Sequence, residues 1–471
     1  MINLIIGIIN YISLPLVNIL LLPKITHNID PIVYGKYTLY NNILSIVILF
    51  SFLGIYPTII QRYLNKKYEN YFEYKKILYF LNIVSLFIYF IISIILLKLY
   101  SNILILVLLL NYLFGNLTSQ IVTFYIVNGE INKSNKIKLY NIICYISVLI
   151  LYIHLKTFSI YSIILGNLIY NIIIILYNFK IFKRLNQIKN INLLILKEII
   201  EYSIPLLFIG ISGVLLYSGD RYMIKLILKN SDYWIGIYSI QYTIYSQIFN
   251  LIVQLYYLYI PSKLYICYEK EGIEKFIKKL NLWIESYLHS SLVIIIILVL
   301  TYPKINKILL SENYNINLNF AIYIILGGFL FGLYRLMGEV LNMLKKTKIL
   351  NLAIWSSGII NIVLNYFFIG RLGIKGAAIT TFISYFFLTI VIYIIILRKI
   401  KKPILTLKQI YILIVFILSV IFIDNFEVKE NISENKVKIL FQVGIEVILV
   451  ISIYLVIFRK KIAKILKEIV K

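Results

Sequence analysis

The chain has 471 residues, of which 61% are hydrophobic and only 14% are charged, and its formal net charge is +27. A soluble protein of this length cannot bury so much apolar surface, and soluble domains are about a quarter charged. The composition therefore excludes a soluble globular enzyme and predicts an integral membrane protein. The basic residues gather in short clusters between long apolar runs, as expected next to a membrane. Nucleic-acid binding is disfavoured, because the sequence offers no soluble basic domain.

Apolar stretches long enough to cross about 30 Å of hydrocarbon follow one another along the chain. The first, residues 3–22, lacks a basic leader and a small-residue cleavage site, so we expect a retained helix rather than a signal peptide. The others are expected at 39–60, 77–97, 103–127, 138–155, 159–178, 200–219, 235–260, 288–310, 319–342, 350–369, 374–397, 408–424 and 439–458. The sequence thus predicts an all-α integral membrane protein with about 14 transmembrane helices.

Most Lys and Arg residues fall in alternate connections between these helices. This asymmetry predicts a multi-pass protein of the cell membrane with both termini in the cytoplasm. The longest cytoplasmic connections are 180–198 and 261–287, and the second has the pattern of an amphipathic helix on the inner membrane surface. No loop is long enough for a soluble catalytic domain, so we expect a protein that is not an enzyme.

The chain also shows an internal repeat. The first helix contains Pro15 and leads to a glycine motif at 34–40, and the seventh contains Pro205 and leads to a similar motif at 235–242. A period of six helices is even, so the two halves share one orientation about an axis along the membrane normal. The predicted organisation is an N-terminal six-helix lobe at 1–180, a C-terminal six-helix lobe at 198–398, two additional transmembrane helices at 408–458 and a basic cytoplasmic tail at 459–471.

Several segments resemble the O-antigen type polysaccharide (oligosaccharide) flippases, whose superfamily also contains the multidrug-and-toxin exporters and the lipid II flippase. The resemblance spans residues 1–400. It rests on Tyr34-Gly35-Lys36-Tyr37, Leu53-Gly54-Ile55, Tyr202-Ser203-Ile204-Pro205 leading to Asp220-Arg221-Tyr222, Ile235-Gly236-Ile237-Tyr238-Ser239, and Asn361 to Asn365 followed by Leu372 to Thr381. It implies two six-helix lobes with two extra helices, which open alternately to either side. The implied substrate is a polyprenyl-pyrophosphate-linked glycan, moved from the inner to the outer leaflet.

An ionised side chain in the hydrocarbon region costs about 2.5–3.5 kcal/mol on insertion scales and therefore needs a reason. Arg335 and Glu339 lie inside the tenth predicted helix, four residues apart and so on one face. They predict either a cavity cation for pyrophosphate beside a protonatable carboxylate, or a structural pair that neutralises itself. We take Arg335 as a substrate-binding candidate and Glu339 as an ion-coupling candidate.

Three further candidates lie near helix ends. Asp220 and Arg221 are expected near the outer end of the seventh helix, where they either couple an ion and bind substrate, respectively, or mark the membrane–water interface. Arg62 ends the second helix on the inner side, where an anchor that follows the positive-inside rule is favoured over attraction of the substrate's phosphates.

The remaining polar residues favour structural interpretations. Asn361 and Asn365 are expected to hydrogen-bond a neighbouring helix rather than a sugar, and Glu446 is expected to be a packing residue satisfied by a partner rather than part of a groove for the lipid headgroup. Tyrosines such as Tyr238 and Tyr242 could line a cavity and contact sugars. An A/T-rich coding bias and the usual interfacial aromatic belt favour a location at the membrane surface instead.

The sequence contains no Gly-rich phosphate loop ending in Gly-Lys-Ser/Thr and no metal-ligand spacing. We therefore expect no catalytic residue, metal or cofactor. The expected partners are the lipid-linked glycan, membrane lipid and other polysaccharide assembly proteins. A MATE-like cation or drug antiporter is the nearest alternative, but it should have an acidic cavity, against which Arg335 and Arg221 argue. A membrane-embedded glycan polymerase or acyltransferase would need a larger outward loop.

Overall fold

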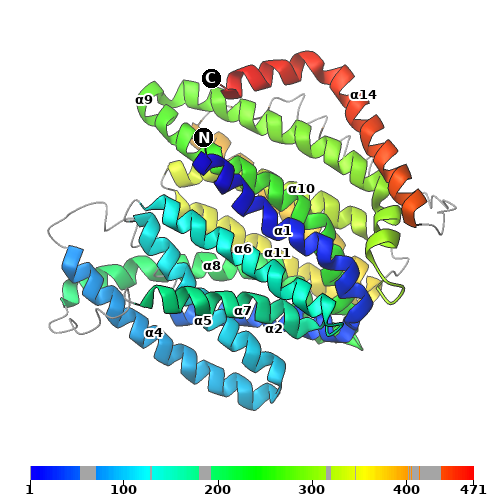
Figure 1. Ribbon diagram of the computed structural model, residues 1–471. Helices are drawn as coiled ribbons and strands as arrows, with labels where there is room; N and C mark the ends of the chain where they lie inside the picture. Colours follow the sequence, from blue (N-terminus) through cyan, green and yellow to red (C-terminus); the bar gives the residue numbers. More distant parts are fainter. Residues whose placement is uncertain are drawn as a thin grey trace. The chain divides into compact units, whose positions relative to one another are not determined.

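The computed structural model describes residues 2–52, 71–127, 130–179, 192–314, 320–344, 346–400, 403, 405, 413 and 436–470. Within these ranges the regular secondary structure is helical and contains no strand (Figure 1). The all-α class predicted from the apolar runs is therefore confirmed. Arg62 lies outside the described residues, and so does the predicted span at 408–424 apart from residue 413.

The first of two compact units comprises Met1–Asn18 and Ile32–Ser218. Its helices are the first part of α1 (Ile2–Asn28), nearly all of α2 (Pro31–Phe52), α4 (Tyr71–Tyr100), α5 (Ile103–Val127), α6 (Ile131–His154), α7 (Ile160–Tyr177) and most of α8 (Leu193–Ile227). Helix α7 packs against both α5 and α6. The buried hydroxyl of Tyr170 on α7 donates to the backbone oxygen of Ile137 on α6 at 2.6 Å, which ties these two helices together.

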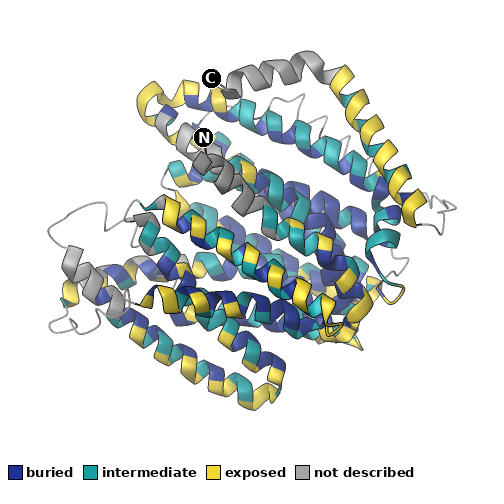
Figure 2. Ribbon diagram, in the orientation of Figure 1, coloured by how far each residue is buried: buried dark blue, intermediate teal, exposed yellow. Residues whose placement is uncertain are grey.

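The second unit comprises Ile19–Pro31 and Gly219–Lys471. Its helices beyond the end of α8 are α9 (Ser231–Leu309), α10 (Ala321–Met343), α11 (Thr347–Leu372), α12 (Ile374–Ile400) and α14 (Lys436–Val470). Helix α10 packs against both α9 and α12, and 78% of its most apolar window is buried (Figure 2). Helix α10 is thus the core of this unit. The boundary between the units falls inside α8, whereas the predicted lobes at 1–180 and 198–398 stay a prediction.

Helix α9 joins three elements that the sequence predicts separately, the spans 235–260 and 288–310 and the connection 261–287. It runs for 79 residues and departs from helical geometry at Gly272, with φ 81° and ψ 175°. This backbone conformation favours glycine, so the chain reverses there without a separate loop.

The connection 261–287 is helical, and its apolar residues pack inside the protein, while its position at the inner membrane surface stays a prediction. Its apolar residues Phe276, Leu280 and Ile284 are at most 1% exposed. Across the break at Gly272, the ring of Phe276 lies 5.5 Å from that of Tyr268, edge to face. The apolar side of the part of α9 that follows Gly272 is therefore buried within the protein instead of in lipid.

Nine helices among the described residues are long and apolar enough to cross a membrane, judged by length and composition. They include α4, α5, α7, α10, α11 and α12. In the apolar part of α14 only 6% of the residues are buried, and its exposed residues include Leu440, Phe441 and Ile448 (Figure 2). A helix surface with so many exposed apolar residues must be covered by something other than water. Lipid covers such a surface when the helix spans a membrane.

Gly236 marks a close approach between α9 and the first residue of α2. A Cβ atom at this position would overlap the backbone carbonyl of Pro31. We expect Gly236→Ala to lower the free energy of unfolding by about 1–3 kcal/mol, as overpacking does. Thermal denaturation of the purified protein in detergent measures the effect. Gly213→Ala in α8 is the matched control, because its Cβ would meet nothing within 4 Å; an equal loss in both variants would contradict the close approach.

Candidate functional site

A buried ion pair lies near the C-terminal end of α8. Asp220 and Arg221 are 2% and 5% exposed, and Nη1 of Arg221 lies 3.1 Å from Oδ1 of Asp220. The same oxygen accepts the backbone N–H of Arg221 at 2.8 Å, and Oδ2 accepts the hydroxyl of Tyr238 at 2.5 Å. Both carboxylate oxygens are therefore hydrogen-bonded, as a buried charge requires.

The guanidinium of Arg221 is enclosed by side chains of α9. Its Nε donates to Oγ of Ser239 at 3.2 Å. The ring centroids of Tyr242 and Tyr238 lie 4.7 Å and 5.5 Å from its Cζ, within the range of cation–π interactions. In this conformation the charge of Arg221 is balanced inside the protein, so its predicted role in binding substrate would require this cluster to open.

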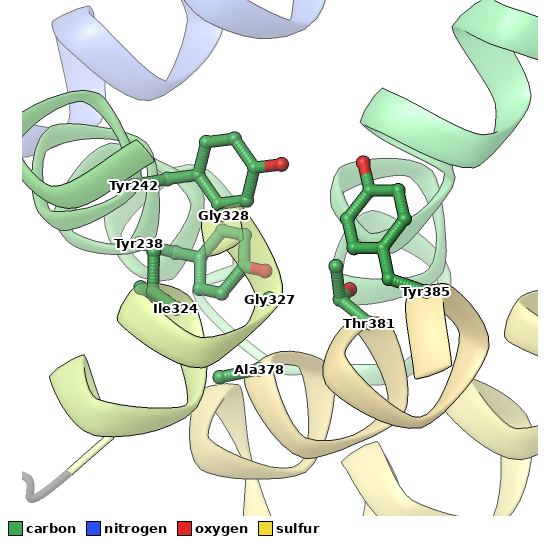
Figure 3. A pocket seen from close by; sticks show the side chains of 8 residues that line it. All are labelled: Tyr238, Tyr242, Ile324, Gly327, Gly328, Ala378, Thr381 and Tyr385. Atoms are coloured by element: carbon green, nitrogen blue, oxygen red, sulfur yellow. The ribbon is translucent and has the colours of Figure 1, made fainter. Parts of the chain in front are cut away.

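A narrow cavity lies beside this pair, between α9, α10 and α12 (Figure 3). Its empty space of about 180 Å³, which includes open solvent, is a slot between side chains that is too narrow to hold a water molecule. Tyr238 and Tyr242 of α9 form one wall, and Thr381 and Tyr385 of α12 stand on the opposite side. The other lining residues are Ile324, Gly327, Gly328 and Ala378. The lining is thus aromatic, hydroxyl-bearing and small, and none of these eight residues is charged.

A hydrogen-bonded ladder joins α11 to α12 and reaches the cavity. Nδ2 of Asn365 donates to Oδ1 of Asn361 at 2.9 Å, and Nδ2 of Asn361 donates to Oγ1 of the cavity residue Thr381 at 3.4 Å. Oδ1 of Asn365 accepts from the hydroxyl of Thr380 at 2.5 Å. Both asparagines are fully buried. The expectation that they hydrogen-bond a neighbouring helix is confirmed.

Helix α10 carries the other charged candidates. Arg335 is half-buried, and its Cζ lies 5.6 Å from the ring centroid of Phe331, one turn earlier. The ring of Phe331 contacts that of the cavity residue Tyr385 at 5.6 Å. Glu339 accepts a hydrogen bond from Nδ2 of Asn342 at 3.3 Å. The structure therefore connects Arg335 to the cavity through two aromatic rings and places Glu339 one turn further along α10.

The assignment of the α9 tyrosines to an interfacial belt is wrong. Tyr238, Tyr242 and Tyr245 are at most 4% exposed, and the hydroxyl of Tyr245 donates to Oδ1 of Asn306 at 2.7 Å. Tyr238 and Tyr242 are four residues apart and share one face of α9. That spacing is typical of a buried stripe on one face of a helix. It is the sequence feature from which the position of these two tyrosines in the cavity wall could have been predicted.

A second ion pair, which the sequence does not reveal, joins α14 to α9 (Figure 1). Lys304 pairs with Glu446, and Nδ1 of His289 is hydrogen-bonded with the hydroxyl of Tyr454. The side chains of Lys304 and Glu446 are 9% and 29% exposed. The expectation that Glu446 is satisfied by a packing partner is confirmed.

No protein-family model and no curated protein matches the sequence. Solved structures do match the fold. The lipid II flippase MurJ, in an inward closed conformation, has a TM-score of 0.62 at 16% identity, over 91% of this chain and 99% of that chain. An outward-facing multidrug resistance MATE transporter of the MOP superfamily has a TM-score of 0.55 at 15% identity, over 85% and 95%. A point mutant of the MATE transporter VcmN of Vibrio cholerae has a TM-score of 0.55 at 12% identity, over 84% and 95%.

These likenesses show a fold shared with membrane transporters and flippases. They cover 84–91% of this chain and 95–99% of the solved chains, so the fold class predicted from the sequence is confirmed. At sequence identities of 12–16%, the likeness shows the fold and does not identify a substrate.

Proposed function

We propose that the protein is a transporter of the cell membrane that flips a polyprenyl-pyrophosphate-linked oligosaccharide from the inner to the outer leaflet for surface polysaccharide assembly. The shared fold supports transport of this kind, because one structural neighbour is a lipid II flippase and two are MATE transporters. Two six-helix lobes would open alternately to the two sides, with both termini in the cytoplasm. The glycan and membrane lipid are the partners, together with other polysaccharide assembly proteins.

The observation that supports a substrate with an anionic headgroup is the position of Arg335. It lies in α10, a helix whose most apolar window is 78% buried, yet its own side chain is only half-buried. A cation within an apolar helix that spans a membrane is costly and marks a substrate or ion pathway by default. A guanidinium also binds phosphate oxygens with two parallel hydrogen bonds. Arg335 is therefore the first substrate-binding residue of the proposal.

The other proposed substrate-binding residues are Arg221 and Arg62. Arg221 becomes available when the cluster around Asp220 opens, and Arg62 would attract the pyrophosphate at the inner mouth. Asp220 and Glu339 are the proposed ion-coupling residues. Protonation or ion binding at Asp220 would weaken its pairing with Arg221, so ion movement and exposure of a phosphate-binding cation would be linked.

The second candidate is a MATE-like cation or drug antiporter, which the likeness to the two MATE structures favours. An organic cation needs a carboxylate or an aromatic cage within reach. The cavity beside α9 has tyrosines but no carboxylate among its lining residues, and the aromatic faces of Tyr238 and Tyr242 already hold Arg221. The flippase is therefore the better-supported function.

Proteoliposomes containing the purified protein distinguish the two candidates. One set carries a short polyprenyl-pyrophosphate oligosaccharide and an impermeant probe of the outer leaflet, and the other carries a cationic dye under a proton gradient. The flippase predicts protein-dependent translocation of the glycan lipid without dye efflux. Dye efflux without glycan translocation would assign the protein to the antiporter class.

A further inference from the structure

We propose that Glu446, in the apolar part of α14, is a proton-binding site, and that its protonation releases α14 from α9. The proposal goes beyond the proposed function, because it concerns a carboxylate to which that function gives no role, and it does not depend on the identity of the substrate. The carrying observation is that α14 is attached to α9 by two polar links and has little apolar burial.

Helix α14 is attached to the second unit by a narrow contact. Only 6% of its most apolar window is buried, and its main packing partner among the described helices is α9 (Figure 1). Lys304 pairs with Glu446, and Nδ1 of His289 is hydrogen-bonded with the hydroxyl of Tyr454. His289 precedes Lys304 by about four turns of α9, whereas Tyr454 follows Glu446 on α14. The two helices are therefore antiparallel and are linked at two separate levels.

In lipid, polar links of this kind help to decide whether two helices stay together. Hydrocarbon chains solvate apolar side chains as well as a neighbouring helix does, so spanning helices gain no hydrophobic driving force for association. The exposed apolar residues of α14, such as Phe441 and Ile448, are suited to lipid whether α14 is docked or released. The position of α14 therefore depends strongly on its polar links to α9.

The two carboxylate oxygens of Glu446 are satisfied unequally. Oε1 accepts a hydrogen bond from Nζ of Lys304, whereas Oε2 is buried and accepts none from any residue that the structure describes. Asp220 differs, because both of its carboxylate oxygens accept hydrogen bonds. A buried polar atom without a partner is costly, so the ionised form is less well stabilised in Glu446 than in Asp220. Glu446 is therefore the better suited of the two to bind a proton.

Proton binding at Oε2 of Glu446 would neutralise the carboxylate and end the ion pair. The side chain of Lys304, which is only 9% exposed, would then carry a charge that has lost its carboxylate. This state is strongly disfavoured, and movement of α14 away from α9 would let the ammonium reach water or lipid headgroups along its flexible stem.

No other carboxylate lies on the facing stretches 288–309 of α9 and 436–456 of α14. A loss of docking in the pH range in which carboxyl groups titrate therefore points to Glu446. The other titratable groups on these stretches are His289, Tyr302, Lys304, Lys307, Lys436, Lys438 and Tyr454.

The test places one spin label on each helix and measures the distance between them. The labels are attached to Leu300→Cys and Leu449→Cys, whose native side chains are 50% and 53% exposed, so neither label disturbs a packed contact. These positions lie one turn from Lys304 and Glu446 and, because the helices are antiparallel, at the same level. The two native cysteines are replaced by serine, and pulsed electron paramagnetic resonance is recorded on the full-length protein in nanodiscs.

We expect this labelled parent to show one short distance at about pH 8 and an additional, longer distance at about pH 4, where carboxyl groups become protonated. Glu446→Gln, which is neutral at every pH, should show the longer distance already at about pH 8, with a released population raised about fivefold or more. The exchanged pair Lys304→Glu with Glu446→Lys should restore the short distance at about pH 8. Lys438→Gln removes an exposed charge from the same helix and should behave like the parent.

Three results would overturn the proton site. The same short distance in Glu446→Gln and in the parent at both pH values would show that the ion pair does not hold α14. A longer distance in Glu446→Gln without any pH response in the parent would make Glu446 an anchor that binds no proton. An equal pH response in the parent and in Glu446→Gln would assign the proton to another group, such as His289.

Size-exclusion chromatography shows whether each variant stays folded and monodisperse. If Glu446→Gln alone fails to fold, the double variant Lys304→Met with Glu446→Gln takes its place, because it leaves no buried charge unpaired. The double variant should show the longer distance at about pH 8 and no pH response; a short distance in this variant would overturn the proposal.

Discussion

Asp220→Ala is expected to destabilise the protein by about 3–5 kcal/mol, because it leaves a buried guanidinium without its carboxylate. Arg221 is only 5% exposed, so water cannot replace the lost partner. The hydroxyl of Tyr238 loses its acceptor at the same time. Chemical denaturation of the purified protein in mild detergent, followed by circular dichroism, measures the loss.

Two variants show whether this effect comes from the buried charge. The double variant Asp220→Ala with Arg221→Leu removes both charges and should recover much of the stability, since apolar replacements of buried ion pairs are tolerated. Asp232→Ala breaks the pair with Lys225, whose side chain is 42% exposed and whose Nζ lies 2.7 Å from Oδ1 of Asp232. It should cost at most about 1 kcal/mol. A double variant no more stable than Asp220→Ala would contradict this account.

Arg335→Gln is expected to weaken binding of a polyprenyl pyrophosphate by about 30-fold, which corresponds to roughly 2 kcal/mol. The loss arises because a charged, two-pronged contact with phosphate is replaced by a neutral amide. The affinity of Arg335→Lys should lie between those of the wild type and Arg335→Gln, since an ammonium keeps the charge but not the planar fork. Microscale thermophoresis with the purified protein measures the dissociation constants.

Arg371→Gln is the matched control for Arg335, because Arg371 is exposed in the last turn of α11. It removes the same charge from the same unit and should leave the affinity within about twofold. Equal weakening by the two variants would show that the overall positive charge attracts the ligand, and Arg335 would then lose its place as the headgroup contact.

The helices were predictable because lipid imposes a length and an apolar composition on each span. The predicted run at 103–127 coincides with α5, Ile103–Val127. The connection 261–287 shows the limit of this reasoning. Its amphipathic pattern is real, but a protein surface and a lipid surface select the same apolar stripe, so the pattern alone cannot name the partner of Phe276 and Leu280.

The candidate site was predictable in part. Asp220 and Arg221 stand out because they are charged residues beside an apolar run, and the structure brings them together. The surroundings of Asp220 and Arg221 were not predictable. They depend on Tyr238, which lies on the next helix, α9, after the chain has turned. Lys304 and Glu446 are 142 residues apart, and sequence spacing carries no information on such a contact between two helices.

The most direct test of the central claim is the rate at which proteoliposomes translocate one oligosaccharide on three lipid carriers: a polyprenyl pyrophosphate, a polyprenyl monophosphate and an uncharged polyprenyl ether. We expect the wild type to prefer the pyrophosphate by about tenfold or more, because the second phosphate adds charge-assisted hydrogen bonds to arginine. We also expect Arg335→Gln to abolish this preference. Equal rates for the three carriers in the wild type would contradict recognition of a pyrophosphate headgroup.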